Sequence, residues 1–257
     1  MTEILKARGV SVHYGGVQAL ADVDLEVNEN ELVGLIGPNG AGKTTFVDAL
    51  TGFTRYTGAM SVDGRDLTGL APHQRARHGL ARTWQSTELF DDLTVSENLA
   101  VGSRRPSPWQ VAKELVATPS TTTPTIEQAL DLVELGWAAD FMPDELSQGQ
   151  RKLVGVARAI ASGPRLLLLD EPAAGLDTSE SEELGHRLRS LARGGTAMLL
   201  IEHDMGLVLS VCDRIVVLEF GKVIAAGTPE EVRRDPRVVE AYLGSAGAAR
   251  AAESLDV

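Results

Sequence analysis

Short uninterrupted runs of apolar residues are the first elements that the chain predicts. The runs 32–36, 166–169 and 197–201 contain no charged side chain, which is typical of strands buried on both faces. The stretches 10–14 and 23–27 instead alternate apolar with small or polar residues. This period of two predicts strands with one exposed face.

Helical spacing or helix-start signals separate these strands. The predicted helices are 44–50, 72–79, 94–102, 126–135, 147–162 and 179–193. Thr94 and Glu97 fit a capping box at the start of the third. Two more segments, 58–67 and 214–227, alternate like hairpins, and the first turns at Asp63-Gly64. Because buried strands alternate with helices in the centre of the chain, we expect a mostly parallel α/β sheet.

The stretch 103–125 interrupts that pattern because Ser, Thr and Pro dominate it, and it predicts an internal loop or linker. With the helices around it, this stretch predicts an inserted helical subdomain over about 86–162. The last residues, 245–257, are rich in Ala, Gly and Ser and predict a flexible tail. We therefore expect a single domain over 3–244.

The charge and the apolar content narrow the class of protein. The 257 residues include 36 acidic and 24 basic side chains, a formal net charge of −12. This charge argues against binding nucleic acid or anionic lipid through bulk positive charge. Cys212 is the only cysteine, so no internal disulfide is possible. No segment has the roughly 20 apolar residues needed to span a bilayer, and the N-terminus lacks an export pattern, so we expect a cytoplasmic protein without direct lipid insertion.

Residues 37–44, Gly-Pro-Asn-Gly-Ala-Gly-Lys-Thr, match the pattern of a phosphate-binding loop. Glycines let backbone amides turn toward phosphate oxygens, and the helix that begins near Thr44 points its positive end at the same anion. Lys43 can reach the β- and γ-phosphates, and the Thr44 hydroxyl can bind Mg²⁺. The predicted ATP ligands are Gly37, Pro38, Asn39, Gly40, Ala41, Gly42, Lys43, Thr44 and Thr45.

Two carboxylates end the leucine strand 166–169, at the edge where ligands bind in such sheets. We expect Asp170 to hold Mg²⁺ directly or through water, and Glu171 to orient or deprotonate the attacking water. His203 follows the third apolar strand and is a candidate to sense the γ-phosphate or position that water. Gln85 is a further candidate, whose amide would lie near the metal, but it carries almost no signal by itself.

Six short elements in order together resemble the nucleotide-binding subunit of ABC transporters. Leu146-Ser-Gln-Gly-Gln150 is similar to that family's signature and lies about 20 residues before Asp170. Tyr14 matches the aromatic position that stacks on adenine, and Gln85 matches the Q-loop. Ala174-Gly-Leu-Asp177 matches the D-loop, and His203 matches the switch histidine. The resemblance covers roughly residues 3–244.

The resemblance implies a P-loop NTPase fold of the ABC ATPase type, with a RecA-like core, an antiparallel β subdomain and the inserted α-helical subdomain. It also implies that two such domains bind head to tail and sandwich ATP and Mg²⁺. Ser147, Gly149, Gln150 and Asp177 would then contact the nucleotide of the partner subunit. Gln148 departs from the glycine usual in the signature. The implied partners are a second ABC ATPase subunit and integral membrane permeases, with no nucleic acid.

Finer similarity extends to the ATPase subunits of branched-chain amino acid importers. It rests on four segments: 79–85, 89–98, 201–205 and 239–244. The leading hypothesis is therefore the ATPase of such an importer, held at the inner face of the membrane by its permeases. The alternatives are the ATPase of a urea or short-amide importer, a soluble ABC ATPase outside transport, and a regulatory nucleotide-binding module.

Overall fold

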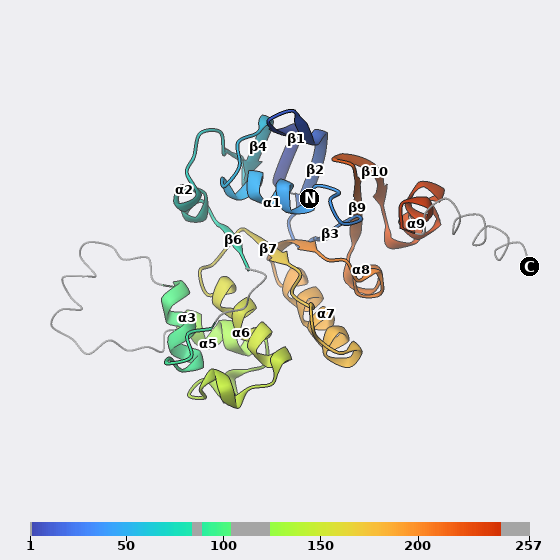
Figure 1. Cartoon of the computed structure of the whole chain (residues 1–257). Coiled ribbons are helices and arrows are strands. Elements are labelled where there is room, and N and C mark those ends of the chain that lie inside the picture. Colours follow the sequence, from blue (N-terminus) through green and yellow to red (C-terminus); the bar gives the residue numbers. More distant parts are fainter. Residues whose placement is uncertain (1, 84–88, 104–123, 243–257) are drawn as a thin grey trace, which may run out of the picture.

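The computed structural model describes residues 2–83, 89–103 and 124–242, and six strands of these ranges form the central sheet in the order β10-β9-β3-β8-β7-β6 (Figure 1). Neighbours run parallel except β10, which pairs antiparallel with β9. The strands are β3 (Leu32–Ile36), β6 (Leu80–Arg82), β7 (Leu166–Asp170), β8 (Ala197–Ile201), β9 (Arg214–Glu219) and β10 (Lys222–Gly227). Every residue of β3, β7 and β8 is buried, which confirms that these apolar runs are strands covered on both faces.

A second, antiparallel sheet has the order β2-β1-β4-β5. Its strands are β1 (Glu3–Tyr14), β2 (Val17–Asn28), β4 (Thr57–Val62) and β5 (Arg65–Asp66). The predicted turn at Asp63-Gly64 is confirmed, with φ of 50° and 72° at these two residues. Helix α1 (Lys43–Thr51) buries Phe46 and Leu50 in one core shared with both sheets. The helix that follows the phosphate loop is therefore held between the two sheets.

The remaining helices pack against the other face of the central sheet or beside its β6 edge. They are α2 (Pro72–Arg77), α3 (Val95–Ser103), α5 (Pro124–Leu132), α6 (Gln148–Ile160), α7 (Thr178–Arg193), α8 (Met205–Val211) and α9 (Pro229–Arg234), with 3₁₀ turns at Gly136–Ala138 and Pro143–Glu145. Figure 1 shows α3, α5 and α6 together below the β6 edge. The capping box at α3 is confirmed, since the Thr94 N–H donates to Glu97 and the Glu97 N–H donates to the Thr94 hydroxyl.

Among the described strands and α-helices, three had no counterpart in the sequence prediction: β6, α8 and α9. They are three, seven and six residues long, too short to display a hydrophobic period. Most of the predicted loop 103–125 and the predicted tail 245–257 lie outside the described residues, so the proposed limits of the domain and of the helical subdomain stay predictions. None of the helices in the described ranges is long and apolar enough to cross a membrane.

Candidate active site

The phosphate loop connects the end of β3 to the start of α1, in the predicted strand–loop–helix context. Gly37 has φ 152°, and a Cβ atom at this position would lie 2.1 Å from the carbonyl oxygen of Leu218, so only glycine fits. Gly42 has φ 106° and is the N-cap of α1, with no side chain to occupy the first-turn amides. The amides of this helix end are thus presented at the carboxyl edge of the sheet, where an anion is favoured. The exposed loop residues include Asn39, Gly40 and Thr44.

Lys43 is buried within the phosphate loop. Its ammonium group donates to the carbonyl oxygens of Gly37 at 2.6 Å and Pro38 at 3.1 Å. Burial lowers the pKa of Lys43, and the nearby carboxylates of Glu171 and Asp170 act in the opposite direction. The fold therefore brings together the lysine and the two carboxylates that the sequence placed about 130 residues apart.

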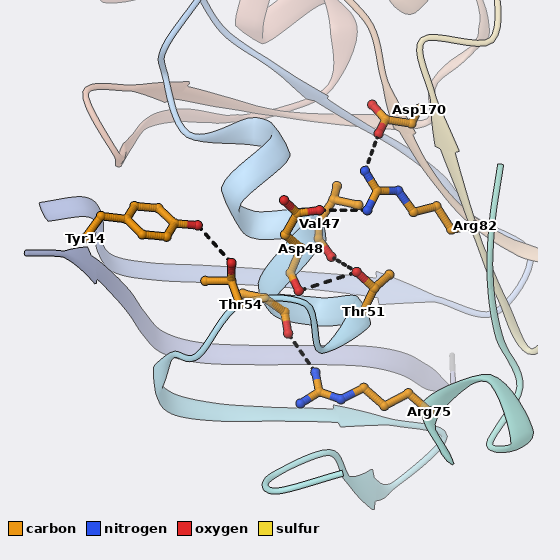
Figure 2. Close-up of polar contacts among 9 residues, drawn as sticks. Tyr14, Val47, Asp48, Thr51, Thr54, Arg75, Arg82 and Asp170 are labelled. Atoms are coloured by element: carbon orange, nitrogen blue, oxygen red, sulfur yellow. Dashed lines mark hydrogen bonds and ion pairs between the residues drawn. The ribbon is translucent and has the colours of Figure 1, made fainter. Parts of the chain in front are cut away.

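Asp170 is buried as the last residue of β7, and an arginine that the sequence prediction left without a role holds it in place. Figure 2 shows Arg82 between two carboxylates, with its Nη2 2.7 Å from Asp170 Oδ2 and its Nη1 2.7 Å from Asp48 Oδ1. The backbone N–H of Asp170 also donates to the Thr83 hydroxyl at 3.2 Å. The only sequence signal for Arg82 was its place in the segment 79–85, which is similar to the importer ATPases.

Glu171 has an unusual backbone. Its φ of 47° lies in the left-handed region, which costs a residue with a side chain about 1–2 kcal/mol. Its N–H donates to the carbonyl oxygen of Ile201 at 2.9 Å, and its own carbonyl oxygen accepts from the Ala174 N–H at 3.2 Å. The carboxylate is therefore directed by a backbone conformation that its neighbours must maintain.

His203 and Glu202 stand at the end of β8 with opposite exposure. The His203 side chain is 61% exposed, whereas Glu202 is completely buried. Glu202 accepts the N–H of Ala173 at 2.8 Å and of His203 at 3.2 Å, and its Oε2 lies 3.6 Å from the ring Nδ1 of His203. Burial raises the pKa of Glu202, against the effect of these amides. The sequence prediction assigned His203 and missed Glu202, which by position alone is an ordinary strand-end residue.

Comparisons with known proteins give the family of this chain. A family model described as ABC transporter matches residues 20–174, more than half of the chain. The chain belongs to the ABC transporter family. A second model, described as branched-chain amino acid ATP-binding cassette transporter, matches residues 222–248.

Individual relatives extend the ABC transporter match to nearly the whole chain. The high-affinity branched-chain amino acid transport ATP-binding protein BraF of Pseudomonas aeruginosa is 41% identical over 95% of this chain and 98% of its own. The LivG protein of Escherichia coli, with the same description, is 39% identical over the same shares. The crystal structure of a nucleotide-free ATP-binding cassette from an ABC transporter aligns with a TM-score of 0.82 and 31% identity, over 94% of this chain and 99% of that one. The P-loop ABC ATPase fold predicted from the sequence is thereby confirmed.

The ABC signature and the D-loop both act as helix caps in this structure. Ser147 is the N-cap of α6, where its hydroxyl accepts the Gln150 N–H at 3.2 Å and Gln150 Oε1 accepts the Ser147 N–H at 2.9 Å. Asp177 is the N-cap of α7 and accepts the Glu180 N–H at 2.8 Å. Gly149 is partly exposed at the start of α6. Contact of these residues with a partner's nucleotide stays a prediction.

Tyr14, another predicted site residue, lies apart from the Lys43–Asp170–Glu171 group. The Tyr14 hydroxyl lies 2.9 Å from the hydroxyl of Thr54, which follows the C-terminal end of α1, whereas the phosphate loop precedes the N-terminal end (Figure 2). Tyr14 is 51% exposed, so a face of its ring remains accessible to a base. Gln85 lies outside the described residues, so its predicted roles stay predictions.

Proposed function

We propose that this chain is the ATP-hydrolysing subunit of an importer for branched-chain amino acids, working through separate membrane subunits. The observation that carries the ATPase assignment is the meeting of Lys43, Asp170 and Glu171 beside the phosphate loop. The substrate class rests on the match of residues 222–248 and on the relatives BraF and LivG. These relatives favour a branched-chain substrate over a urea or short-amide importer and over a soluble ATPase outside transport.

A magnesium ion fits the chemistry of the donors that the chain offers. The Thr44 hydroxyl and the Asp170 carboxylate are oxygen ligands, as Mg²⁺ prefers, and the Gln85 amide would add a third. The bond from Arg82 engages Asp170 Oδ2 and leaves the carboxylate further lone pairs with which it would hold a cation. When bound, Mg²⁺ neutralises charge on the β- and γ-phosphates.

The chain's own groups would divide the remaining work. Lys43 and the amides of the α1 N-terminus hold the phosphates, which are pure acceptors. Glu171 orients and deprotonates the attacking water, from the fixed backbone position described above. His203, exposed at the end of β8, contacts the γ-phosphate or that water. Tyr14 stacks its exposed ring face on adenine.

The second half of the site comes from another subunit of the same family. Each motif occurs once in the chain, so the signature residues Ser147, Gly149 and Gln150 and the D-loop residue Asp177 would serve the partner's nucleotide. The amino end of α6 suits that task because a helix N-terminus attracts an anion. The ATP-bound state is then a closed dimer, which hydrolysis reopens.

An apolar groove offers a docking place for the permease. It has a volume of about 740 Å³ and lies between α2 and the helices α3 and α6, which we assign to the helical subdomain. Phe53, Phe90 and Val101 line it with exposed apolar side chains. Arg82 also lines the groove and bonds Asp170, so a permease loop in the groove would lie one residue from the site. Docking here would hold the subunit at the inner face of the membrane.

The substitution Glu171→Gln tests the proposed function. We expect ATP affinity to stay within about two-fold and kcat to fall by about 10²–10⁴, because a general base is lost. The matched control is Glu183→Gln, an exposed carboxylate on α7 that should leave kcat unchanged. Normal turnover in Glu171→Gln would reject Glu171 as the base. Proteoliposomes that contain the permeases and hydrolyse ATP without taking up leucine would reject the substrate class.

A further inference from the structure

Two buried charged side chains hold the short segment that leads from Glu171 into the D-loop. Glu202 Oε1 accepts the N–H of Ala173 at 2.8 Å, and Lys152 Nζ donates to the carbonyl oxygen of Ala174. Glu202 is 0% and Lys152 7% exposed. The chemistry described above uses neither charge. The residues that they bond, Ala173 and Ala174, nevertheless lie two and three residues after Glu171.

Lys152 reaches the segment from α6, the helix that begins at the signature. Other residues at the start of α6 face the same stretch of chain. A Cβ atom at Gly175 would lie 3.1 Å from Gln148 Nε2, and one at Gly149 would lie 3.1 Å from Glu180 Oε1. The start of α6 therefore packs directly on the D-loop and the first turn of α7.

Glu202 reaches the segment from the end of β8 and also contacts the switch histidine. Its second oxygen accepts the His203 N–H, so one carboxylate joins the Ala173 backbone to the His203 backbone. Burial lowers the pKa of Lys152, and the charges of Glu202 and Glu171 oppose that effect. Isolated buried charges are costly, so Lys152 and Glu202 are stable in the interior only while each keeps its hydrogen-bond partners.

The left-handed backbone of Glu171 makes this support consequential. Such a conformation persists only where the surroundings impose it. One support is the bond from the Glu171 N–H to the carbonyl oxygen of Ile201. Another is the restraint on Ala173, only two residues further along the chain.

We propose that Lys152 and Glu202 are positioning residues for ATP hydrolysis: together they fix the segment Ala173–Ala174, and through it Glu171, relative to α6 and His203. The inference rests on the proposed function, because it assigns how the catalytic carboxylate is held. Its consequence is that the helix carrying the signature, which would meet the partner's ATP, is connected to the residues that act on this subunit's own ATP.

The test measures kcat and KM of the full-length chain with ATP and Mg²⁺. Lys152→Met should lower kcat about ten-fold or more and leave KM within about two-fold, because the phosphate loop is untouched while Glu171 shifts. Lys152→Arg, which can still donate to Ala174, should recover at least half of the rate. Glu202→Gln should lower kcat about three-fold or more, since Glu202 accepts from Ala173 and His203 with two different oxygens and the amide would replace one of them with an NH2 group, a donor.

The control is Arg187→Met. Arg187 is another largely buried cation that donates to a backbone carbonyl, that of Val133, but it lies on α7 away from the site. It should lower the thermal unfolding midpoint without changing kcat. Lys152→Met and Glu202→Gln combined should cost little more than the larger single effect, because both act on one segment.

Three results would overturn the inference. In the first, folded Lys152→Met has a kcat within about two-fold of wild type. In the second, its KM rises while kcat is unchanged, which would indicate a role in nucleotide binding instead. If Lys152→Met does not fold, Glu202→Gln is the deciding variant. A wild-type kcat in Glu202→Gln is then the third result that would overturn the inference. A wild-type chain that binds ATP without turnover when its partner ATPase subunit and permeases are present would instead overturn the proposed function, and this inference with it.

Discussion

Arg82 bonds the carboxylate of Asp170, with 2.7 Å between its Nη2 and Oδ2 of the aspartate. Its other terminal nitrogen bonds Asp48 at the same distance, so one guanidinium joins the end of β7 to the helix that follows the phosphate loop. The side chains of Arg82 and Asp170 are only 9% and 8% exposed. The bond therefore belongs to the interior, where the loss of one partner leaves the other charge uncompensated.

The substitution Arg82→Met should lower the free energy of unfolding by about 3–5 kcal/mol, the usual cost of breaking a buried pair from one side. Urea denaturation measures this loss. The control is Arg165→Met, since Arg165 is 43% exposed and pairs with Asp63 and Glu29. Exposed pairs contribute about 1 kcal/mol or less. Equal losses in the two variants would contradict an interior role for Arg82.

The substitution Lys43→Met should weaken ATP binding about 10- to 100-fold, because hydrogen bonds to charged groups contribute about 1.5–3 kcal/mol. Isothermal titration calorimetry with ATP measures this change. The control is Lys222→Met, because Lys222 is an exposed lysine on β10. It changes the net charge by the same amount and should leave the affinity unaltered. An equal effect of both substitutions would mean that overall charge, and not the loop geometry, governs binding.

Substitutions of Tyr14 distinguish stacking of its ring on adenine from the hydrogen bond of its hydroxyl to Thr54. Tyr14→Ala should weaken ATP binding about 5- to 100-fold, the range expected for one base on an aromatic ring. Tyr14→Phe keeps the ring and loses the hydroxyl that meets Thr54, so it should bind ATP nearly normally. Thr54→Val removes the same contact from the other side and should match Tyr14→Phe. Weak binding in Thr54→Val would instead indicate that the anchor places the ring.

Cys212 predicts a dependence of stability on alkaline pH. Burial raises the pKa of its thiol from 9.0 to about 12. Below pH 9 the thiol is protonated in both states. Between pH 9 and 12 only the unfolded chain loses the proton, so this group's contribution to stability declines by about 1.4 kcal/mol per pH unit. Denaturation curves at pH 8 and 10.5 should show a smaller decline for Cys212→Ala, and identical declines would contradict this assignment.

The sequence predicted those elements whose residues share one environment. The strands 32–36, 166–170 and 197–201 are uniformly buried, so an apolar run was sufficient to identify them. The phosphate loop was equally accessible because its chemistry depends on residues that are consecutive in the chain. The carboxylates of Asp170 and Glu171 followed from the strand that they end.

The missed residues act through contacts between distant parts of the chain. Arg82 and Asp170 are 88 residues apart, Lys152 and Ala174 are 22 apart, and Glu202 and Ala173 are 29 apart. A single arginine, lysine or glutamate in a sequence is usually a solvated surface residue. Only the packing of β6, α6 and β8 against β7 and its following turn makes these charges interior, and no local pattern encodes that packing.

The Ser147 cap at the start of α6 determines which hydrogen-bonding groups this helix end offers to a ligand. Ser147 accepts a hydrogen bond from the Gln150 N–H, and its own O–H is available to donate to a ligand. The first-turn amides of a helix are donors as well. A donor-rich helix end discriminates between the two ends of a nucleotide, because the anionic triphosphate oxygens are favoured there over the neutral ribose and base. The same small cap that begins the helix would thus decide which way round a second subunit can offer its nucleotide.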